Sequence, residues 1–311
     1  MAKMGFMKSA AEVLTGNGKP SLRAYLHTRM TGLRSPRSIM RIHASELTKP
    51  DTYCPRETSL HLITGRDRPD DYINTCLQYT FDLGDALHDL LRDTWARDIV
   101  FGDWRCKHCD KRYYQTRYPK SCTGCGRSRF MYEEVRFKSL VSGASGGLDL
   151  LVKLPGVDKL VIVEAKTIKH DDWKVLKAPQ AEHELRTNYY MRLVDESDNN
   201  LGEFIDTEQA LVIYMTKGYG GKDPTLADSG IMDSLTPFKE WWVKRNDKAT
   251  DVLNVRATAT NNFINQGTVP EGVCPSIHCP RAKKCIMRKE CFSDLYPAGS
   301  VHKLIIGTTL C

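Results

Sequence analysis

The sequence predicts an α/β layer structure, in which strands are interleaved with helices. Apolar runs of strand length alternate with helical segments, and a Pro-Gly turn joins two of these runs. Four cysteines are grouped in two pairs between residues 106 and 125. With 311 residues, 41% of them hydrophobic and 27% charged, the chain is long enough to form a full hydrophobic core.

The expected elements follow from hydrophobic period and turn residues. A helix over about 71–98 places Gly84, His88, Leu91 and Trp95 on one face, and a shorter helix begins near Ser45. Apolar runs at 147–154 and 159–166, joined by Pro155-Gly156-Val157-Asp158, predict a β-hairpin. The remaining expected elements are a strand at 130–140, a helix at 179–194, strands at 209–216 and 301–306, and a long helix at 236–265.

The expected hairpin brings acidic residues together. With a four-residue loop, Asp149 is directly opposite Glu164, and opposed side chains have Cβ atoms about 4.5–5.5 Å apart. Lys166 lies two residues beyond Glu164 and therefore shares its face. Leu151 and Ile162 border the pair, so we expect two carboxylates and an ammonium group at the end of an apolar hairpin.

Two adjacent carboxylates in apolar surroundings need a compensating charge. A divalent cation supplies it, and oxygen ligands suit Mg²⁺ or Mn²⁺, which can polarise a phosphate and lower the pKa of a bound water. Lys166 could then position that water, and His88 could add a neutral imidazole ligand. The alternative is a solvent-exposed acidic pair neutralised by Lys166.

The cysteine pairs between residues 106 and 125 predict a second metal site. The spacing Cys106-x2-Cys109-x12-Cys122-x2-Cys125 is typical of a structural zinc ribbon, in which the metal supplies the folding energy. The segment is basic and also contains Tyr113 and Tyr114, so it could clamp nucleic acid; a solvated knob or a protein-docking tip explains it equally well. Its basic residues are Lys107, His108, Lys111, Arg112, Arg117, Lys120, Arg127 and Arg129.

A third cysteine group lies near the C-terminus. Cys274, Cys279, Cys285 and Cys291 are interleaved with five Lys and Arg residues, which favours thiolates that bind a metal. The sequence also has Cys54, more than 200 residues earlier in the chain.

Together these motifs resemble a known family. Asp149 with Glu164-Ala165-Lys166 resembles the PD-(D/E)XK nuclease signature, and His88 in GDALHDLL resembles the helix-borne histidine of the RecB-type branch. Cys54-Pro55-Arg56 with the late cysteines resembles the iron–sulfur RecB-like nucleases, which include the CRISPR-adaptation nucleases and the AddB nuclease domains. The resemblance covers about residues 42–292, in the family's order.

The resemblance implies a restriction-endonuclease-like mixed sheet flanked by helices, with the zinc ribbon as an insertion and a 4Fe–4S cluster that closes the fold. In that family one remote and three late cysteines hold the cluster, here Cys54, Cys274, Cys279 and Cys285, with Cys291 as the alternative late ligand in place of Cys274. A local zinc site made by the late cysteines alone, with Cys54 an ordinary thiol, is the competing interpretation.

The resemblance also implies contacts to nucleic acid from the helix after the Lys166 strand. That helix usually carries a Gln followed four residues later by a Tyr. The best register here uses His183, Arg186 and Tyr190, with Arg186 where Gln is expected. Arg186 is then a phosphate ligand, and Tyr190 either contacts DNA or packs in the helix interface. Glu134 is a further candidate at the border of the site.

The expected function is that of a metal-dependent deoxyribonuclease, by resemblance an exonuclease acting on single strands or DNA ends in recombination, repair or end processing. A helicase, recombinase or annealing protein is the expected protein partner. The alternative is a nucleic-acid-binding or assembly factor with an inactive nuclease fold. The expected organisation is a basic N-terminal extension at 1–41, a nuclease domain at 42–298 with the zinc ribbon inserted at 104–127, and a tail at 299–311.

Charge and hydropathy set the remaining expectations. The formal net charge of +7 is compatible with a polyanionic partner. Membrane spans need about 18 consecutive apolar residues, and the sequence has no such run. The first ten residues lack the apolar stretch of a signal peptide. We therefore expect a cytoplasmic protein that is not bound to a membrane.

Overall fold

A computed structural model describes residues 22–36, 38–49, 53–218 and 237–302. The chain divides into two compact units, one made of residues 1–38 and 67–86 and the other of residues 39–66 and 87–311. The expected extension at 1–41 and tail at 299–311 lie partly outside the described residues. The domain boundaries expected from the sequence stay predictions.

The described part of the first unit contains few buried residues. Its helix α2 (Leu22–Met30) is followed by β1 (Gly32–Arg34), which pairs antiparallel with β3 (Asp71–Ile73). The first twelve residues of α5 (Thr75–Leu90) also belong to this unit. Neither α2 nor α5 contains a buried residue.

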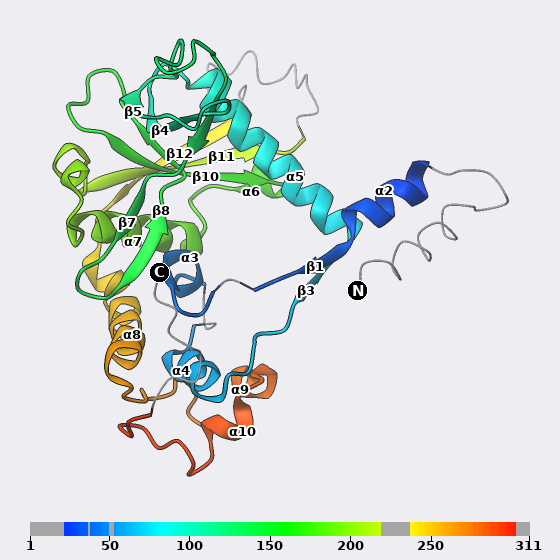
Figure 1. Cartoon of the computed structure of the whole chain (residues 1–311), viewed down its shortest axis with the longest axis vertical. Coiled ribbons are helices and arrows are strands. Elements are labelled where there is room, and N and C mark those ends of the chain that lie inside the picture. Colours follow the sequence, from blue (N-terminus) through cyan, green and yellow to red (C-terminus); the bar gives the residue numbers. More distant parts are fainter. Residues whose placement is uncertain (1–21, 37, 50–52, 219–236, 303–311) are drawn as a thin grey trace. The chain divides into compact units, whose positions relative to one another are not determined.

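The second unit is built on a mixed sheet that has seven strands among the described residues (Figure 1). Its order is β12-β11-β10-β9-β4-β5, and β6 also pairs with β4. Only the β10–β11 pair is parallel within this path. The strands are β4 (Val100–Cys106), β5 (Arg112–Thr116), β6 (Phe130–Glu133), β9 (Leu150–Val152), β10 (Val161–Ile168), β11 (Gln209–Thr216) and β12 (Phe238–Lys244).

A second, three-stranded sheet in the described residues has the order β2-β8-β7. Its strands are β2 (Ile42–His43), β7 (Arg136–Lys138) and β8 (Ala144–Gly147). The segment 130–140, predicted as one strand, is therefore split between two sheets at Glu134 and Val135. Glu134, a candidate at the border of the site, therefore belongs to neither strand.

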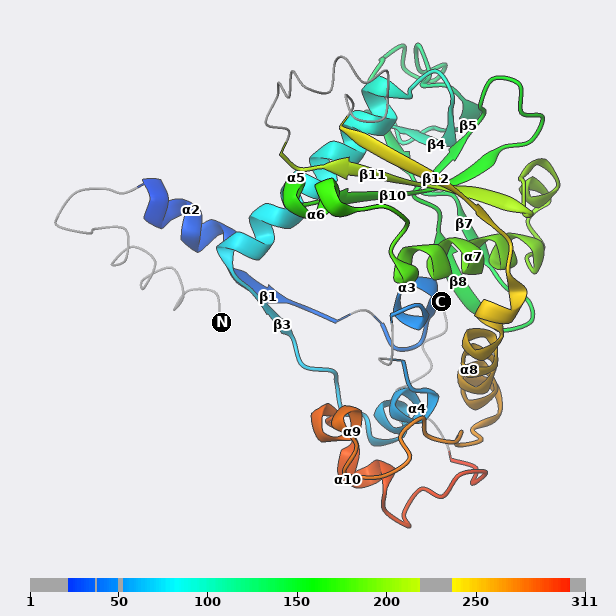
Figure 2. The ribbon, with the colours of Figure 1, turned by 180° about the vertical axis from the view of Figure 1, so that it is seen from behind.

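Helices cover the sheet and connect its strands (Figure 2). Helix α7 contacts both β10 and β11, and α6 contacts β11. Helix α4 begins with Pro55 and ends at Gly65, which has the left-handed φ of 65° that favours glycine. The helices of this unit are α3 (Ala44–Leu47), α4 (Pro55–Thr64), a π-turn (Leu91–Trp95) that continues α5, α6 (His170–Val175), α7 (Ala181–Asp195), a 3₁₀ turn (Asn200–Phe204), α8 (Asp247–Gln266), α9 (Pro280–Lys284) and α10 (Arg288–Cys291).

The long helix predicted at 236–265 was wrong in its first part. Residues Phe238–Lys244 form β12, in which Trp241 pairs with Val212 and packs edge-on against Tyr214. Aromatic and β-branched residues fit this half-buried edge, and the sheet contact overrides the helical pattern. Helix α8 begins only after Asn246, whose side chain accepts a hydrogen bond from the backbone N–H of Ala249.

Strand β10 separates two hydrophobic cores. Val161, Val163 and Ala165 face one core, whereas Leu160 and Ile162 face the other, together with α7. Glu164 and Lys166 occupy positions on the Ile162 side of the strand, as the two-residue period requires. The predicted mixed sheet flanked by helices is thus confirmed. Among the described helices, none has the length and apolarity needed to cross a lipid bilayer.

Candidate functional site

Pairing of β9 with β10 places Asp149 beside Glu164. Leu150 pairs with Val163, so the same register puts Asp149 opposite Glu164, as the sequence predicts. Asp149 Oδ2 accepts a hydrogen bond of 3.1 Å from the backbone N–H of Ala165 and another of 3.1 Å from Lys166 Nζ. Lys166 Nζ also lies 2.6 Å from Glu164 Oε1. The structure therefore brings Asp149, Glu164 and Lys166 together.

The carboxylate of Glu164 is buried, and only one of its two oxygens has a hydrogen-bond or ion-pair partner among the described residues. Its side chain is 0% exposed, compared with 17% for Asp149 and 20% for Lys166. Glu164 Oε2 has no hydrogen-bond partner among the described residues. A buried carboxylate oxygen without a partner is costly, and a cation is the ligand that such an oxygen favours. Together with Asp149 it gives the oxygen-rich donor set that suits Mg²⁺ or Mn²⁺.

The three charges shift one another's pKa values. Burial and the adjacent charge of Asp149 raise the pKa of Glu164 to about 7. Burial acts to raise the pKa of Asp149 as well, but Lys166 and His88 outweigh it and hold that pKa below its usual value. Burial acts to lower the pKa of Lys166, yet Asp149 and Glu164 together raise it above its usual value. Lys166 is therefore a permanent cation at neutral pH.

His88 and Glu134 lie at the border of this group. His88, near the end of α5, is half-buried and close enough to Asp149 to lower its pKa. Glu134 follows β6, and burial together with Asp149 raises its pKa. A Cβ atom at Gly147 would lie 2.1 Å from Glu134 Oε2, so the glycine leaves room for this carboxylate. The predicted roles of both residues stay predictions.

Arg186 contacts Glu164 directly. From α7, its NH1 lies 3.3 Å from Glu164 Oε1, its NH2 lies 2.5 Å from Glu182 Oε1, and its Nε donates to Thr48 Oγ1 at 3.2 Å. The Arg186 side chain is only 13% exposed. Arg186 thus supplies a second cation to Glu164. Its predicted contact with a DNA phosphate stays a prediction.

Three further residues line the α7 side of the site. Tyr190 is 5% exposed and belongs to the core, so it packs as the alternative interpretation has it; its contact with nucleic acid is untested. His183 Nδ1 lies 2.8 Å from the hydroxyl of Tyr214, which pairs with Lys166 across the parallel strands. Burial, reinforced by Lys166 and Arg186, lowers the pKa of His183 to about 4, so this imidazole is neutral. Sequence reasoning missed Tyr214, because only the parallel pairing of β10 with β11 brings it to the site.

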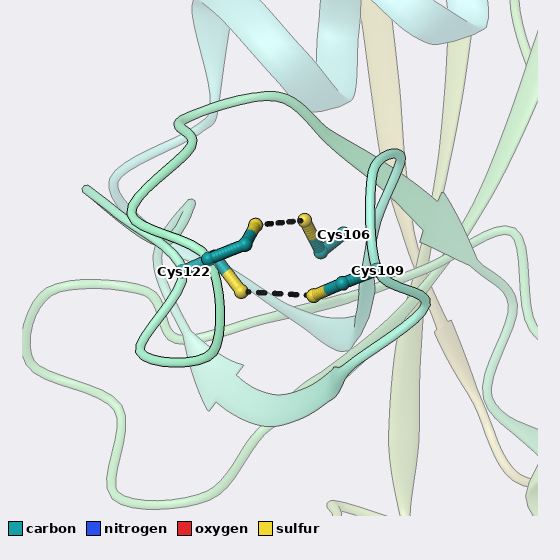
Figure 3. A group of neighbouring side chains, drawn as sticks. Cys106, Cys109 and Cys122 are labelled. Carbon is teal, nitrogen blue, oxygen red and sulfur yellow. Dashed lines mark hydrogen bonds between the residues drawn. The ribbon is translucent and has the colours of Figure 1, made fainter.

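The four cysteines of the predicted ribbon converge. Their sulfur atoms all lie within 4.8 Å of one another, with Cys106 Sγ 3.6 Å from Cys125 Sγ and Cys109 Sγ 3.4 Å from Cys122 Sγ (Figure 3). Four thiolates at this spacing match the closed tetrahedral set of a structural zinc ion. In the described residues this is the one group of three or more His, Cys, Asp or Glu residues that meets the 4.8 Å limit.

The two cysteine knuckles have matching backbones. The residue after each pair, Asp110 and Gly126, has a left-handed φ, 60° and 71° respectively. Each donates its backbone N–H to the carbonyl of the first cysteine in its pair, at 3.0 Å and 2.8 Å. The Tyr113 hydroxyl donates to Cys122 Sγ at 3.3 Å and lowers the pKa of that thiol to about 6. The thiolate of Cys122 is therefore favoured, whereas burial and hydrogen bonds among the cysteines raise the pKa of Cys109 and Cys125.

Cys54 and the late cysteines lie in one region of the second unit. Cys54 is the N-cap residue of α4, and the side chain of Arg56 donates to the carbonyl of Cys291 at 3.1 Å. Burial raises the pKa of Cys291, to which Cys54 and Cys274 also contribute as neighbouring thiols. Cys54 and Cys291 are therefore neighbours, and their predicted link through a shared metal cluster stays a prediction.

Arginine 281 links the remaining thiols of this region. Its NH1 donates to Cys274 Sγ at 3.6 Å, and its NH2 lies 2.6 Å from Glu57 Oε2. Cys279 Sγ accepts the backbone N–H of Ala282 at 3.3 Å at the start of α9. Burial and Glu57 raise the pKa of Cys285 to about 12. Sulfur donors and cations therefore share this region, although Cys54 and the late cysteines do not meet the 4.8 Å limit in the described residues. The iron–sulfur and the zinc interpretation both stay predictions.

Comparisons with known proteins give distant structural matches. No protein-family model matches the chain, and no curated protein sequence matches it. Among solved structures it is similar to the crystal structure of SSO0001 (13% identity, TM-score 0.35, covering 96% of this chain and 97% of that one). It is also similar to LHK-Exo in complex with dAMP, with 11% identity and a TM-score of 0.34, covering 73% of this chain and 89% of that one. A phage-related exonuclease from Haemophilus somnus 129PT matches with 12% identity and a TM-score of 0.35, covering 72% of this chain and 93% of that one. Similarity of this degree carries no argument about function.

Proposed function

We propose that the chain is a metal-dependent deoxyribonuclease of the RecB-like PD-(D/E)XK type. The observation that carries the proposal is the meeting of Asp149, Glu164 and Lys166 on one buried face of the β9–β10 hairpin, with Glu164 Oε2 left without a partner. This is the arrangement expected of that nuclease signature, and an exposed acidic pair does not account for a Glu164 that is 0% exposed. The restriction-endonuclease-like core and the 4Fe–4S cluster on Cys54, Cys274, Cys279 and Cys285 belong to the same proposal.

Asp149 and Glu164 would hold the Mg²⁺ or Mn²⁺, with His88 as the neighbouring imidazole ligand. A divalent ion at this position supplies a Lewis acid for the phosphate and lowers the pKa of a bound water. The reaction is hydrolysis by in-line attack of water on phosphorus, in which one phosphorus–oxygen ester bond breaks.

Lys166 acts as a fixed cation. Because its pKa is raised above the usual value, its ammonium group stays protonated and cannot serve as a general base. It can donate hydrogen bonds to the attacking water and stabilise the negative charge that develops on the phosphate oxygens. Its contacts with both Asp149 and Glu164 hold the ammonium group where these tasks require it.

The test is digestion of end-labelled single- and double-stranded DNA with Mg²⁺ or Mn²⁺. We expect the wild type to degrade at least one of these substrates and Glu164→Gln to lose at least about a thousandfold in rate, as expected when a metal-binding carboxylate is removed. Asp158→Asn, which changes an exposed acid in the hairpin turn, is the control and should retain full activity. A Glu164→Gln variant that digests DNA at the wild-type rate contradicts the proposal.

The same assay addresses the alternative function. A protein that binds DNA but shows no digestion under any of these conditions is a binding or assembly factor with an inactive nuclease fold. The pattern of labelled products reports whether the enzyme acts from ends, as the proposed exonuclease would in recombination or repair. A helicase, recombinase or annealing protein remains the proposed partner class.

A further inference from the structure

The positive charge of the chain is concentrated in the cysteine ribbon. Residues 104–129 contain eight Lys and Arg residues and one acid, Asp110, a net charge of +7. This equals the formal charge of the whole chain, so the other residues carry 37 basic and 37 acidic groups and are neutral in sum. A short segment that holds the entire excess charge indicates a surface for a polyanion.

Most of these cations have no anionic partner. Arg105 and Arg112, at the base of the ribbon, form ion pairs with Asp103, Asp110 and Glu133. The other six are exposed, and none of them forms an ion pair within the described residues: Lys107, Lys111, Arg117, Lys120, Arg127 and Arg129. The fold neutralises the cations at the sheet and leaves the outer ones available.

The ribbon is held firmly by the sheet that carries the site. Its strand β4 pairs with β9 through Val100–Val152 and Phe101–Leu151, and β9 pairs with β10. The ring of Trp104 makes edge-to-face contacts with the rings of Tyr118 and Tyr132, which pack the end of the ribbon that adjoins the sheet. The basic surface therefore has a fixed position two strands away from the strand of Glu164 and Lys166.

The exposed residues of the ribbon do not match a protein interface. Such interfaces have an apolar or aromatic centre and few lysines. Between residues 107 and 129 the exposed large hydrophobic side chain is Tyr114 alone, at 58%, and all these residues lie within the described part. Tyr113, the other tyrosine of the segment, uses its hydroxyl on Cys122 and Thr123 and has a structural role. Exposed cations and an exposed aromatic ring in one segment suit phosphates and an unstacked base.

We propose that the zinc ribbon is a nucleic-acid clamp that binds the phosphate backbone of the substrate beside the Asp149–Glu164 site. This inference depends on the proposed function only in calling the bound nucleic acid the substrate. Binding of the phosphate backbone itself is measured without cleavage. This assignment favours nucleic acid over a partner protein as the ligand of the ribbon.

The test compares two triple substitutions that remove the same charge. The ribbon variant is Lys120→Gln, Arg127→Gln and Arg129→Gln, and the control is Lys174→Gln, Lys244→Gln and Lys248→Gln. The control residues are exposed and lie on α6, β12 and α8, where β12 and the ribbon strand β5 occupy opposite edges of the sheet. Binding of a fluorescent single-stranded oligonucleotide is followed by anisotropy at several salt concentrations without added divalent metal. Zinc content and circular dichroism confirm that both variants are folded.

We expect the ribbon variant to bind at least about tenfold more weakly at low salt than the control. The slope of log affinity against log salt should fall in magnitude by about 2, as three lost phosphate contacts on a single strand require. Equal affinity and slope in the two variants overturn the clamp and leave the protein-docking tip. An inactive protein that still shows the ribbon-dependent slope overturns the nuclease and retains the clamp, so the two failures are distinguishable.

Discussion

The guanidinium group of Arg186, on α7, lies 3.3 Å from the carboxylate of Glu164, on β10. Lys166 already lies 2.6 Å from the same carboxylate oxygen, Oε1. Glu164 therefore has two cations on one oxygen and no partner on the other. We infer that Arg186 opposes metal binding electrostatically while leaving Oε2 open to a metal ion.

Replacing Arg186 with Gln, the residue typical of the resembling family, should strengthen Mn²⁺ binding at pH 8.5. Removing a neighbouring positive charge should lower the dissociation constant about fivefold, or ~1 kcal/mol. The measurement is calorimetric titration with Mn²⁺. Arg192→Gln is the control, because Arg192 is on the same helix and pairs with Glu196 and Asp251 instead. Weaker Mn²⁺ binding by Arg186→Gln alone shows that the arginine supports the metal site.

The pKa of Glu164 predicts the pH dependence of metal binding. Because burial and Asp149 raise this pKa to about 7, the carboxyl group is mostly protonated below pH 7 in the metal-free protein. A metal ion must displace that proton, so the apparent affinity should fall up to about tenfold for each pH unit below 7 and level off above it. The rise in melting temperature caused by Mn²⁺ should accordingly be larger at pH 8 than at pH 6. An equal rise at both values contradicts the shifted pKa.

Zinc should be bound by the ribbon with one ion per chain. In Cys106→Ser with Cys109→Ser we expect this zinc to be lost and the protein to become more susceptible to proteolysis between residues 104 and 129, because a metal ion bound by four converging thiolates joins the two cysteine pairs. Zinc analysis and limited proteolysis make the comparison. Cys76→Ser, which changes an exposed cysteine of α5, should have no effect. Unchanged zinc in the double variant refutes the ribbon.

The late cysteines should give the purified protein a brown colour from iron. Cys54→Ser should bleach it, because Cys54, the N-cap residue of α4, lies near the late cysteine Cys291 and is a proposed ligand of the cluster. Absorption spectra and iron analysis of Cys274→Ser and Cys291→Ser identify the late ligand that the sequence leaves open. Colourless protein with two zinc ions per chain establishes the competing four-cysteine zinc site.

The hairpin of the site could be predicted because its determinants are local. Gly156 adopts a left-handed φ of 76° in the predicted turn, and the alternation on each side then fixes the register of Asp149 against Glu164. The spacing of the paired cysteines likewise predicted their convergence. Both inferences use residues that are close in the sequence.

The rest of the site depends on contacts between distant segments. Arg186 reaches Glu164 only because α7 packs on β10, and Tyr214 approaches His183 only through the parallel pairing of β10 with β11. The wrong helix at 236–265 has the same origin, since the pairing of Trp241 with Val212 determines the conformation of that segment. Local periodicity contains no information about such partners.

Binding of Mn²⁺ by Asp149 and Glu164 is the property on which the proposed metal-dependent hydrolysis depends. Electron paramagnetic resonance during an Mn²⁺ titration counts bound ions without any assumption about substrate. The proposed metal site predicts one Mn²⁺ per wild-type chain at pH 8 and the loss of that ion in the double variant Asp149→Asn with Glu164→Gln. The double variant Asp158→Asn with Glu208→Gln, which changes two exposed acids outside the site, should retain the ion. The same number of bound ions in both double variants contradicts the proposed metal site.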